Sequence, residues 1–123
     1  MDQYTEINSQ DDMDNLIKSK VSFHDSMVKE VQMLNRGFVY ENRSMDMGHR
    51  FDAKILFQTQ WEPLAFELIC IGISSLNIVG PEEFMGATGS VTENTVREIE
   101  LSLDGEFVVN CERMFYRLTP ESV

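Results

Sequence analysis

Residues 96–118 read VREIELSLDGEFVVNCERMFYRL, and this stretch decides the fold. Apolar and polar residues alternate on both sides of Asp104-Gly105, as they do in half-buried β-strands. Asp-Gly between two such runs is a strong hairpin signal, because both central residues of a type I′ turn need a positive φ. The stretch therefore predicts two antiparallel strands, at 96–103 and 106–118.

Two shorter strands are predicted earlier in the chain. Residues 26–34 (SMVKEVQML) and 38–42 (FVYEN) have the composition of strands, and Asn35-Arg36-Gly37 between them is a turn signal. A polar loop that ends in glycine follows at 43–48. The sequence therefore predicts that the chain turns at 35–37.

Two longer strands complete the predicted sheet. Residues 49–60 alternate between apolar and polar, and Pro63 ends this run because proline cannot donate to a central ladder. Residues 65–79 (AFELICIGISSLNIV) are apolar on both faces in their middle, which is typical of a central strand that is covered on both sides. The N-terminal helix is the expected cover on one side, and residues 82–95 are expected to be irregular.

A short helix is predicted at 9–20. Ser9 offers an N-cap and aspartates follow it in the first turn, where the helix dipole favours negative charge. Apolar residues then recur at helical spacing, which gives one face that can pack on the sheet. Residues 1–8 and 119–123 are expected to be loose ends.

These elements predict a mainly β (α+β) domain with one short N-terminal helix and about six strands. The connections are mostly short, which implies antiparallel neighbours. The strands form a meander, either curled into a partly open barrel or folded as a small sandwich, and the sequence leaves both open. A chain of 123 residues fits a single domain, 1–123.

Acidic residues dominate the charge, since 21 Asp and Glu against 10 Lys and Arg give a net charge of −11. Phosphate groups repel such a chain, so we expect it to bind neither nucleic acid nor anionic lipid. A basic protein is the partner that this charge permits, and a homodimer is also compatible with it. No apolar run is long enough to span a membrane and no secretion signal begins the sequence, which predicts a soluble, cytoplasmic protein.

The two cysteines, Cys70 and Cys111, both lie in apolar runs that are predicted to be strands. Buried cysteine behaves as a small hydrophobe, and thiols stay reduced in the cytoplasm. The sequence contains no C-x-x-C and no Cys/His cluster, so it predicts neither a zinc site nor a cofactor.

His24 and Asp25, within the sequence FHDS at 23–26, are the first candidate site residues. A neighbouring His and Asp suggest an acid–base pair, but adjacent residues of a strand point to opposite faces. The structural interpretation is that Phe23 anchors the core while Asp25 or Ser26 forms the bend between helix and strand. On that interpretation, substituting His24 or Asp25 changes stability and leaves binding intact.

Three further residues are candidates for binding rather than catalysis. His49 and Arg50 begin a predicted strand, and His49 could share a metal with His24 only if the fold brought the two together. Trp61 lies at a turn beside Pro63, where it could anchor a partner or cap the end of a barrel. The sequence predicts no catalytic residues.

The sequence FHDS leading into a short strand, followed by an antiparallel meander with a strand like FELICIGISSLNIV, resembles uncharacterised small bacterial β-domain families. Some relatives of that type are immunity proteins, which bind and block a toxin. The resemblance covers most of the chain as a pattern, is nearly literal in four residues, and transfers no functional residue.

Three functions are therefore expected, in descending order. The first is a non-catalytic protein-binding domain of the immunity or inhibitor type, which agrees with the small size, the acidic balance and the resemblance. The second is a small hydrolase that uses His24 and a carboxylate. The third is an assembly subunit that pairs through an exposed strand edge.

Overall fold

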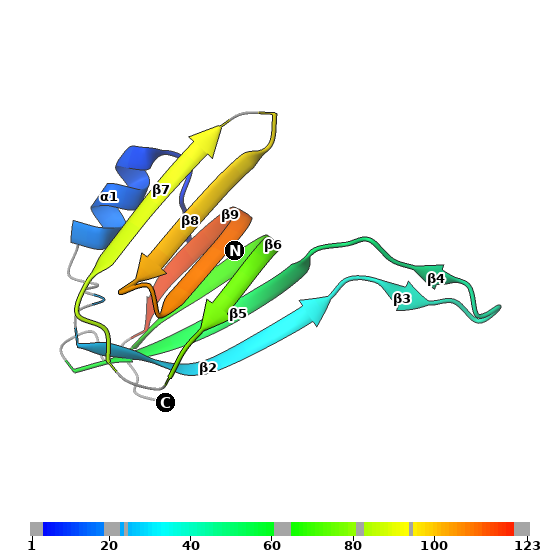
Figure 1. The fold of residues 1–123 in the computed structure, drawn as a ribbon, viewed down its shortest axis with the longest axis horizontal. Helices are drawn as coiled ribbons and strands as arrows, with labels where there is room; N and C mark the ends of the chain where they lie inside the picture. Colours follow the sequence, from blue (N-terminus) through cyan, green and yellow to red (C-terminus); the bar gives the residue numbers. More distant parts are fainter. Residues whose placement is uncertain are drawn as a thin grey trace.

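The computed structural model describes residues 4–18, 23, 25–60, 65–80, 83–93 and 95–119. Within these ranges one helix and nine strands follow the chain, and all strand pairs are antiparallel (Figure 1). The elements are β1 Thr5–Glu6, α1 Gln10–Lys18, β2 Ser26–Asn35, β3 Phe38–Val39, β4 Met45–Asp46, β5 Phe51–Thr59, β6 Ala65–Ile78, β7 Ala87–Glu93, β8 Arg97–Leu103 and β9 Phe107–Thr119.

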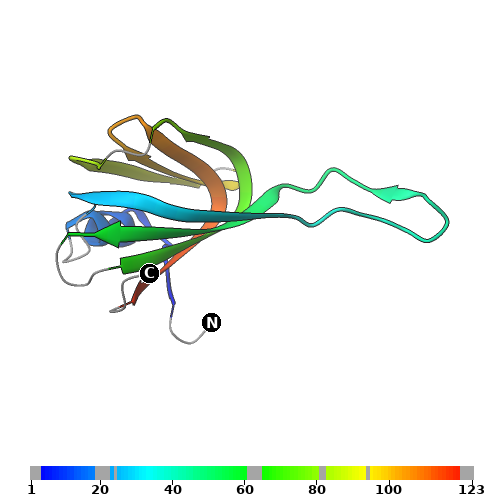
Figure 2. The ribbon, with the colours of Figure 1, turned by 90° about the horizontal axis from the view of Figure 1, so that it is seen from below.

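Seven strands form one sheet in the order β2-β5-β6-β9-β8-β7, with β1 paired to the later part of β9. The sheet is strongly curved and α1 lies on its inner side (Figure 2). Its two edges, β2 and β7, do not pair along their lengths, although a single bridge joins Ser26 to Phe84. The predicted mainly β, antiparallel fold is confirmed, and the sheet is not closed into a barrel.

The expected chain reversal at Asn35-Arg36-Gly37 is wrong. The Asn35 side chain accepts a hydrogen bond from the Gly37 N–H at 2.9 Å, which interrupts the ladder without turning the chain back. The chain instead continues through β3 and reverses at 40–44, where the Tyr40 N–H donates to the Ser44 carbonyl at 2.8 Å. Arg43 has a φ of 73° at this tip, and part of the expected 43–48 loop forms β4.

The expected irregular stretch at 82–95 is also wrong, because β7 lies within it and pairs with β8 over seven residues. Its glycines resemble breakers, but Gly89 serves the packing of α1. A Cβ at Gly89 would overlap the Met13 Sδ and lie 2.7 Å from the Met13 Cγ. The glycine therefore lets the helix approach the strand closely, and α1 packs on β7 rather than over the central β6.

The start of the helix and the last hairpin both form where the local sequence signals predict them. Ser9 caps α1, with its Oγ accepting a hydrogen bond from the Asp12 N–H at 3.1 Å. Asp104 and Gly105 have φ values of 57° and 73°, and the Glu106 N–H donates to the Leu103 carbonyl at 3.0 Å. These findings confirm the N-cap and the Asp-Gly hairpin.

Residues 4–8 are not the expected loose end. Thr5 and Glu6 pair with β9, and the neighbouring Ile7 is fully buried in the core. The Ile7 N–H also donates to the Met114 carbonyl at 2.9 Å. Two residues of pairing are too short for a propensity signal, so the sequence pattern did not reveal this strand.

A cluster of phenylalanines fills the inner side of the sheet. The rings of Phe57 and Phe66 stack at 4.7 Å, and Phe23 meets both edge-on at 5.8 and 5.0 Å. Phe107 continues the cluster from Phe57 at 5.5 Å, and Phe84 lies 6.3 Å beyond it. Aromatic pairs contribute about 0.5–1.5 kcal/mol beyond the area that they bury, so this cluster joins the two ends of the β6–β9 ladder across the inner side of the sheet.

Cys70 and Cys111 are free thiols, fully buried in the same core. The hydrogen bond to Cys111 and the burial both raise the pKa of the Cys70 thiol well above its ordinary value. The expected burial of both cysteines is therefore confirmed.

Replacing Gly89 by alanine tests the helix contact. Gly89→Ala should destabilise the protein by about 1–3 kcal/mol, because the added methyl group overpacks the space that Met13 fills. The loss should lower Tm by several degrees in thermal unfolding. Met13→Ala in the same chain removes the clash, so the double variant should be more stable than the sum of the two single losses predicts. Strict additivity of the two losses would contradict the contact.

Candidate functional site

Two of the five residues predicted to form a site, His24 and Trp61, lie outside the described residues. Asp25 has a φ of 62° and makes backbone hydrogen bonds to Phe84 at 2.8 Å and from Gln60 at 3.3 Å. The Ser26 Oγ donates to the Phe23 carbonyl at 2.6 Å, and Phe23 is buried. The interpretation of this segment as a core anchor followed by a bend is confirmed for the three described residues.

His49 and Arg50 lie just before β5, far from that bend. Ser26 pairs with Thr59 at one end of the β2–β5 ladder, whereas Asn35 pairs with Phe51 at the other. Asp25 and His49 are therefore separated by the whole ladder, roughly 30 Å for a ten-residue strand at about 3.3 Å per residue. Among the described residues no group of His, Cys, Asp and Glu could hold a metal ion.

The feature that sequence reasoning missed is a two-stranded arm, residues 35–50, which projects away from the curved sheet (Figures 1 and 2). It continues β2 outward and returns into β5, and β3 and β4 pair within it. An isolated two-stranded hairpin is marginally stable in water, so an arm of this kind is expected to rest on something else. Residues 38–42 have the composition of a strand, and Met45, Met47 and Phe51 recur at every second or fourth position, but such patterns do not say whether a hairpin lies in the sheet or beyond it.

Both faces of the arm carry large apolar side chains. Phe38 and Tyr40 lie on one face with their rings 4.6 Å apart, and their exposed fractions are 52% and 48%. Val39 pairs with Met45 on the other face, where Met47 follows two residues later. Those three side chains are 60–68% exposed. No residue of the arm belongs to the core cluster, so these side chains add nothing to the packing of the described core.

Charge on the arm differs from charge on the rest of the chain. Residues 35–50 contain three arginines against Glu41 and Asp46, a net charge of +1. Since the whole chain carries −11, the residues outside 35–50 together carry −12. His49 pairs with Asp46 at 2.9 Å along the returning half of the arm. The arm is thus an apolar, slightly basic projection from a strongly acidic body.

The root of the arm is held by one irregular residue in β6. Gly72 has a φ of 69° and its N–H donates to the Asp52 Oδ1 at 3.0 Å, while its carbonyl accepts from the Arg50 Nη1 at 3.4 Å. Asp52 also pairs with Arg36 at 3.4 Å, and Arg50 with Glu112 at 3.3 Å. Both strands of the arm are therefore tied to the same point of the sheet.

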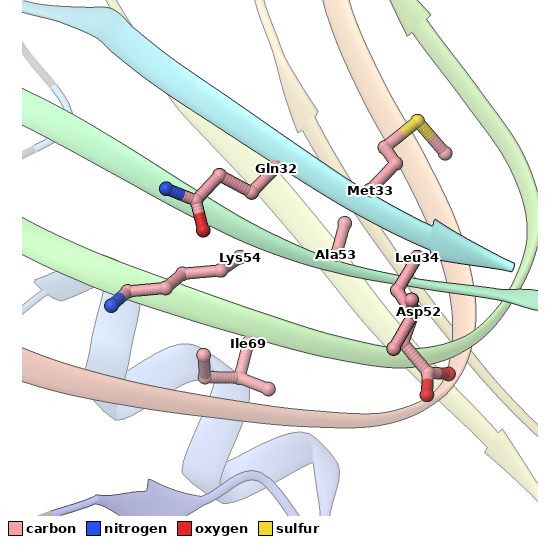
Figure 3. A pocket seen from close by; sticks show the side chains of 7 residues that line it. All are labelled: Gln32, Met33, Leu34, Asp52, Ala53, Lys54 and Ile69. Carbon is pink, nitrogen blue, oxygen red and sulfur yellow. The ribbon is translucent and has the colours of Figure 1, made fainter. Parts of the chain in front are cut away.

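A shallow hollow lies beside this root (Figure 3). It is lined by Gln32, Met33, Leu34, Asp52, Ala53, Lys54 and Ile69. Figure 3 shows Met33 and Ala53 directed to the opposite side of the strands from Leu34 and Asp52. The lining of the hollow combines the apolar Leu34 and Ile69 with polar and charged side chains from Gln32, Asp52 and Lys54.

A polar cluster that shares Lys54 with this hollow lies on the outer face, which is the face turned away from α1. The buried Glu67 accepts hydrogen bonds from the Tyr4 hydroxyl at 2.6 Å and the Arg117 Nη2 at 2.9 Å, and Lys54 lies 3.8 Å away. Burial opposes ionisation of Glu67, but the two hydrogen bonds and the nearby positive charges outweigh it and lower its pKa. Burial and the Glu67 carboxylate raise the pKa of Tyr4. The cluster joins the segment before β1 to the sheet, and we assign it to stability rather than to chemistry.

No protein-family model, curated protein or solved structure matches this chain in sequence or fold comparisons. Among the described residues, no helix has the length and apolar character needed to cross a membrane. The arm, its root and the adjacent hollow are therefore assigned as the candidate functional site on geometry alone.

Two substitutions of Asp52 separate its two roles at the root. Asp52→Ala leaves the Gly72 N–H without its partner, so the amide protons of Gly72 and of the arm should exchange faster in NMR-detected hydrogen exchange. Asp52→Asn keeps an acceptor oxygen and removes only the charge that faces Arg36, so exchange at Gly72 should stay slow. Equal exchange rates in the alanine variant and the parent protein would show that Asp52 does not hold the root.

Acidification tests the Glu67 cluster. Because the folded-state pKa of Glu67 is lowered, its contribution to stability is present above the unfolded value of about 4.3 and is lost as pH falls through the folded pKa. Glu67→Gln removes this titration. The difference in free energy of unfolding between parent and variant should therefore be larger at pH 7 than at pH 3, as measured by urea denaturation. A difference that does not change with pH would contradict this role.

Proposed function

We propose that the chain is a non-catalytic protein-binding domain and that the arm is its binding element. One observation carries the proposal: large apolar side chains on both faces of a projecting hairpin that adds nothing to the described core. Exposed apolar surface of this kind marks interaction sites, and aromatic residues and methionine are enriched in protein interfaces. The curved sheet and its helix act as the rigid support.

The inhibitor or immunity type is the finer form of this proposal. It draws on the small size, the acidic balance and the resemblance that begins with FHDS at 23–26. A toxin bound through the arm would have to accept apolar side chains and a slightly basic hairpin, whereas a strongly basic partner would fit the acidic sheet better. The identity of the bound protein decides between these forms.

The hydrolase alternative has less support. It requires a concave pocket with His24 at its edge, and His24 lies outside the described residues. Its neighbours Phe23 and Asp25 serve in core packing and in a backbone turn. The assembly alternative is favoured by a specific observation, the open edge of β2.

Site-specific photo-crosslinking tests the binding role of the arm. A photoreactive phenylalanine analogue in place of Phe38, in the cells that make the protein, should capture a polypeptide. The same analogue in place of Val96, which is similarly exposed but lies before β8, should capture none. In purified form the captured polypeptide should bind the parent protein, and Met47→Asp should weaken binding by about tenfold or more. Absence of an adduct from Phe38, or equal adducts from both positions, would reject the arm as the binding element.

A further inference from the structure

We infer that the protein bound by the arm is a second copy of this chain, and that two copies lay their arms along each other's β2 edges. This inference rests on the proposed function and names the partner of the same site. It draws on four observations: an open strand edge, the continuity of that edge with the arm, the opposite charges of arm and body, and the apolar side chains on both.

The two edge strands of the sheet, β7 and β2, differ in whether side chains or other strands bond their outward-facing backbone groups. At β7 the Gln10 side chain of α1 donates to the Gly89 carbonyl at 3.0 Å and accepts from the Val91 N–H at 2.9 Å, so it occupies the polar groups of that edge. At β2, within the described residues, only Ser26 is bridged on the side away from β5. The rest of β2 is an open edge, and an open edge is a template for strand addition.

The arm and this edge belong to one continuous segment. The chain runs from β2 directly through β3 to the tip, as both views show (Figures 1 and 2). When such a segment pairs antiparallel with its own copy around a two-fold axis near Asn35, the outgoing half of each arm lies along the partner's β2. The outgoing half of the arm, residues 35–40, spans roughly 20 Å at about 3.3 Å per residue, so it would cover about six residues of the ten-residue β2 before the chain reverses.

Charge favours the second copy over a strongly basic partner. The arm carries +1, and β2 itself has no net charge because Lys29 balances Glu30, so each arm would meet a neutral strand on a body that carries −12 in all. Repulsion between the two acidic bodies acts over longer distances and is screened beyond about 8 Å at physiological ionic strength. A strongly basic protein would instead meet the net positive charge of the arm.

Apolar side chains are also available on both partners. Met33 and Leu34 on β2 are 47% and 62% exposed, and they point to opposite sides of the sheet. A strand added beside β2 would place Val39 and Phe38, which also lie on opposite faces, next to these two positions. Association would thus cover apolar surface on both faces of the arm.

The mass in solution provides the first test. Light scattering on the purified chain at micromolar concentration should give twice 14.2 kDa, which is 28.4 kDa. Val39→Asp should weaken dimerisation by about tenfold or more. Val96→Asp is the matched control, because Val96 is similarly exposed but lies on neither the arm nor β2, and it should leave the dimer intact. Val96→Asp should keep the parent's Tm, because Val96 lies outside the core and outside the contact. Val39→Asp should lower Tm only by the lost stabilisation of the dimer, so its Tm should depend less on protein concentration than the parent's does.

Intermolecular crosslinking then locates the contact. Val39→Cys and Gln32→Cys, prepared separately and mixed, should form a mixed adduct with a short thiol crosslinker, because the arm of one copy would lie on the β2 edge of the other. Glu106→Cys, at the exposed β8–β9 turn, replaces Gln32→Cys as the control and should form none with Val39→Cys. The native thiols are buried and should not react.

The outcomes separate this inference from the proposed function. A monomer at these concentrations, or an adduct yield as high with Glu106→Cys as with Gln32→Cys, overturns the second copy as the partner. If Phe38 then captures a different polypeptide in cells, the arm remains the binding element with another occupant. If Phe38 captures nothing and the chain is monomeric, both proposals fail.

Discussion

The interrupted ladder at Gly72 is the constraint on which the functional geometry depends. In a regular central strand, backbone N–H and carbonyl groups pair with neighbouring strands and are not available to side chains. The positive φ of Gly72 directs its N–H and carbonyl to Asp52 and Arg50 instead. A Cβ at this position would also lie 2.8 Å from the Glu112 carboxylate. Glycine is therefore required where the arm meets the sheet.

The root at Gly72 divides the molecule into the curved sheet with its helix, which is the body, and the arm. Below the root, phenylalanine side chains and α1 fill the inner side of the curved sheet, and the Gln10 side chain covers the β7 edge. Beyond the root, apolar side chains face outward on a hairpin with no described core of its own. The structure thus separates the packed core from the exposed apolar side chains of the arm.

Signals that act between neighbouring residues predicted the structure well. Asp104-Gly105 and the Ser9 cap each specify a conformation through their own backbone and side-chain chemistry, so one sequence is enough to recognise them. The bend at Asp25 and Ser26 was interpreted correctly for the same reason. The position of 65–79 at the centre of the sheet also agreed with its apolar composition.

Features that depend on distant partners were missed. Gly89 resembles a strand breaker until Met13 is placed against it, and β1 is too short to recognise without β9. The arm was missed because alternation records two faces of a strand and not what covers them. The same reason applies to two of the candidate site residues. His49 lies on the arm and Arg50 lies at its root, but nothing in their local sequence indicates the contact with Gly72.

Because the arm lies wholly outside the core, its sequence could change through evolution more freely than that of the sheet. Because no residue from 35 to 50 contributes to the core cluster, insertions, deletions and substitutions there leave the folding of the sheet largely unaffected. Selection can therefore change the exposed surface of the hairpin while the sheet stays constant. The same separation makes the arm a natural graft site, at which a foreign recognition sequence could be displayed between Gly37 and Gly48.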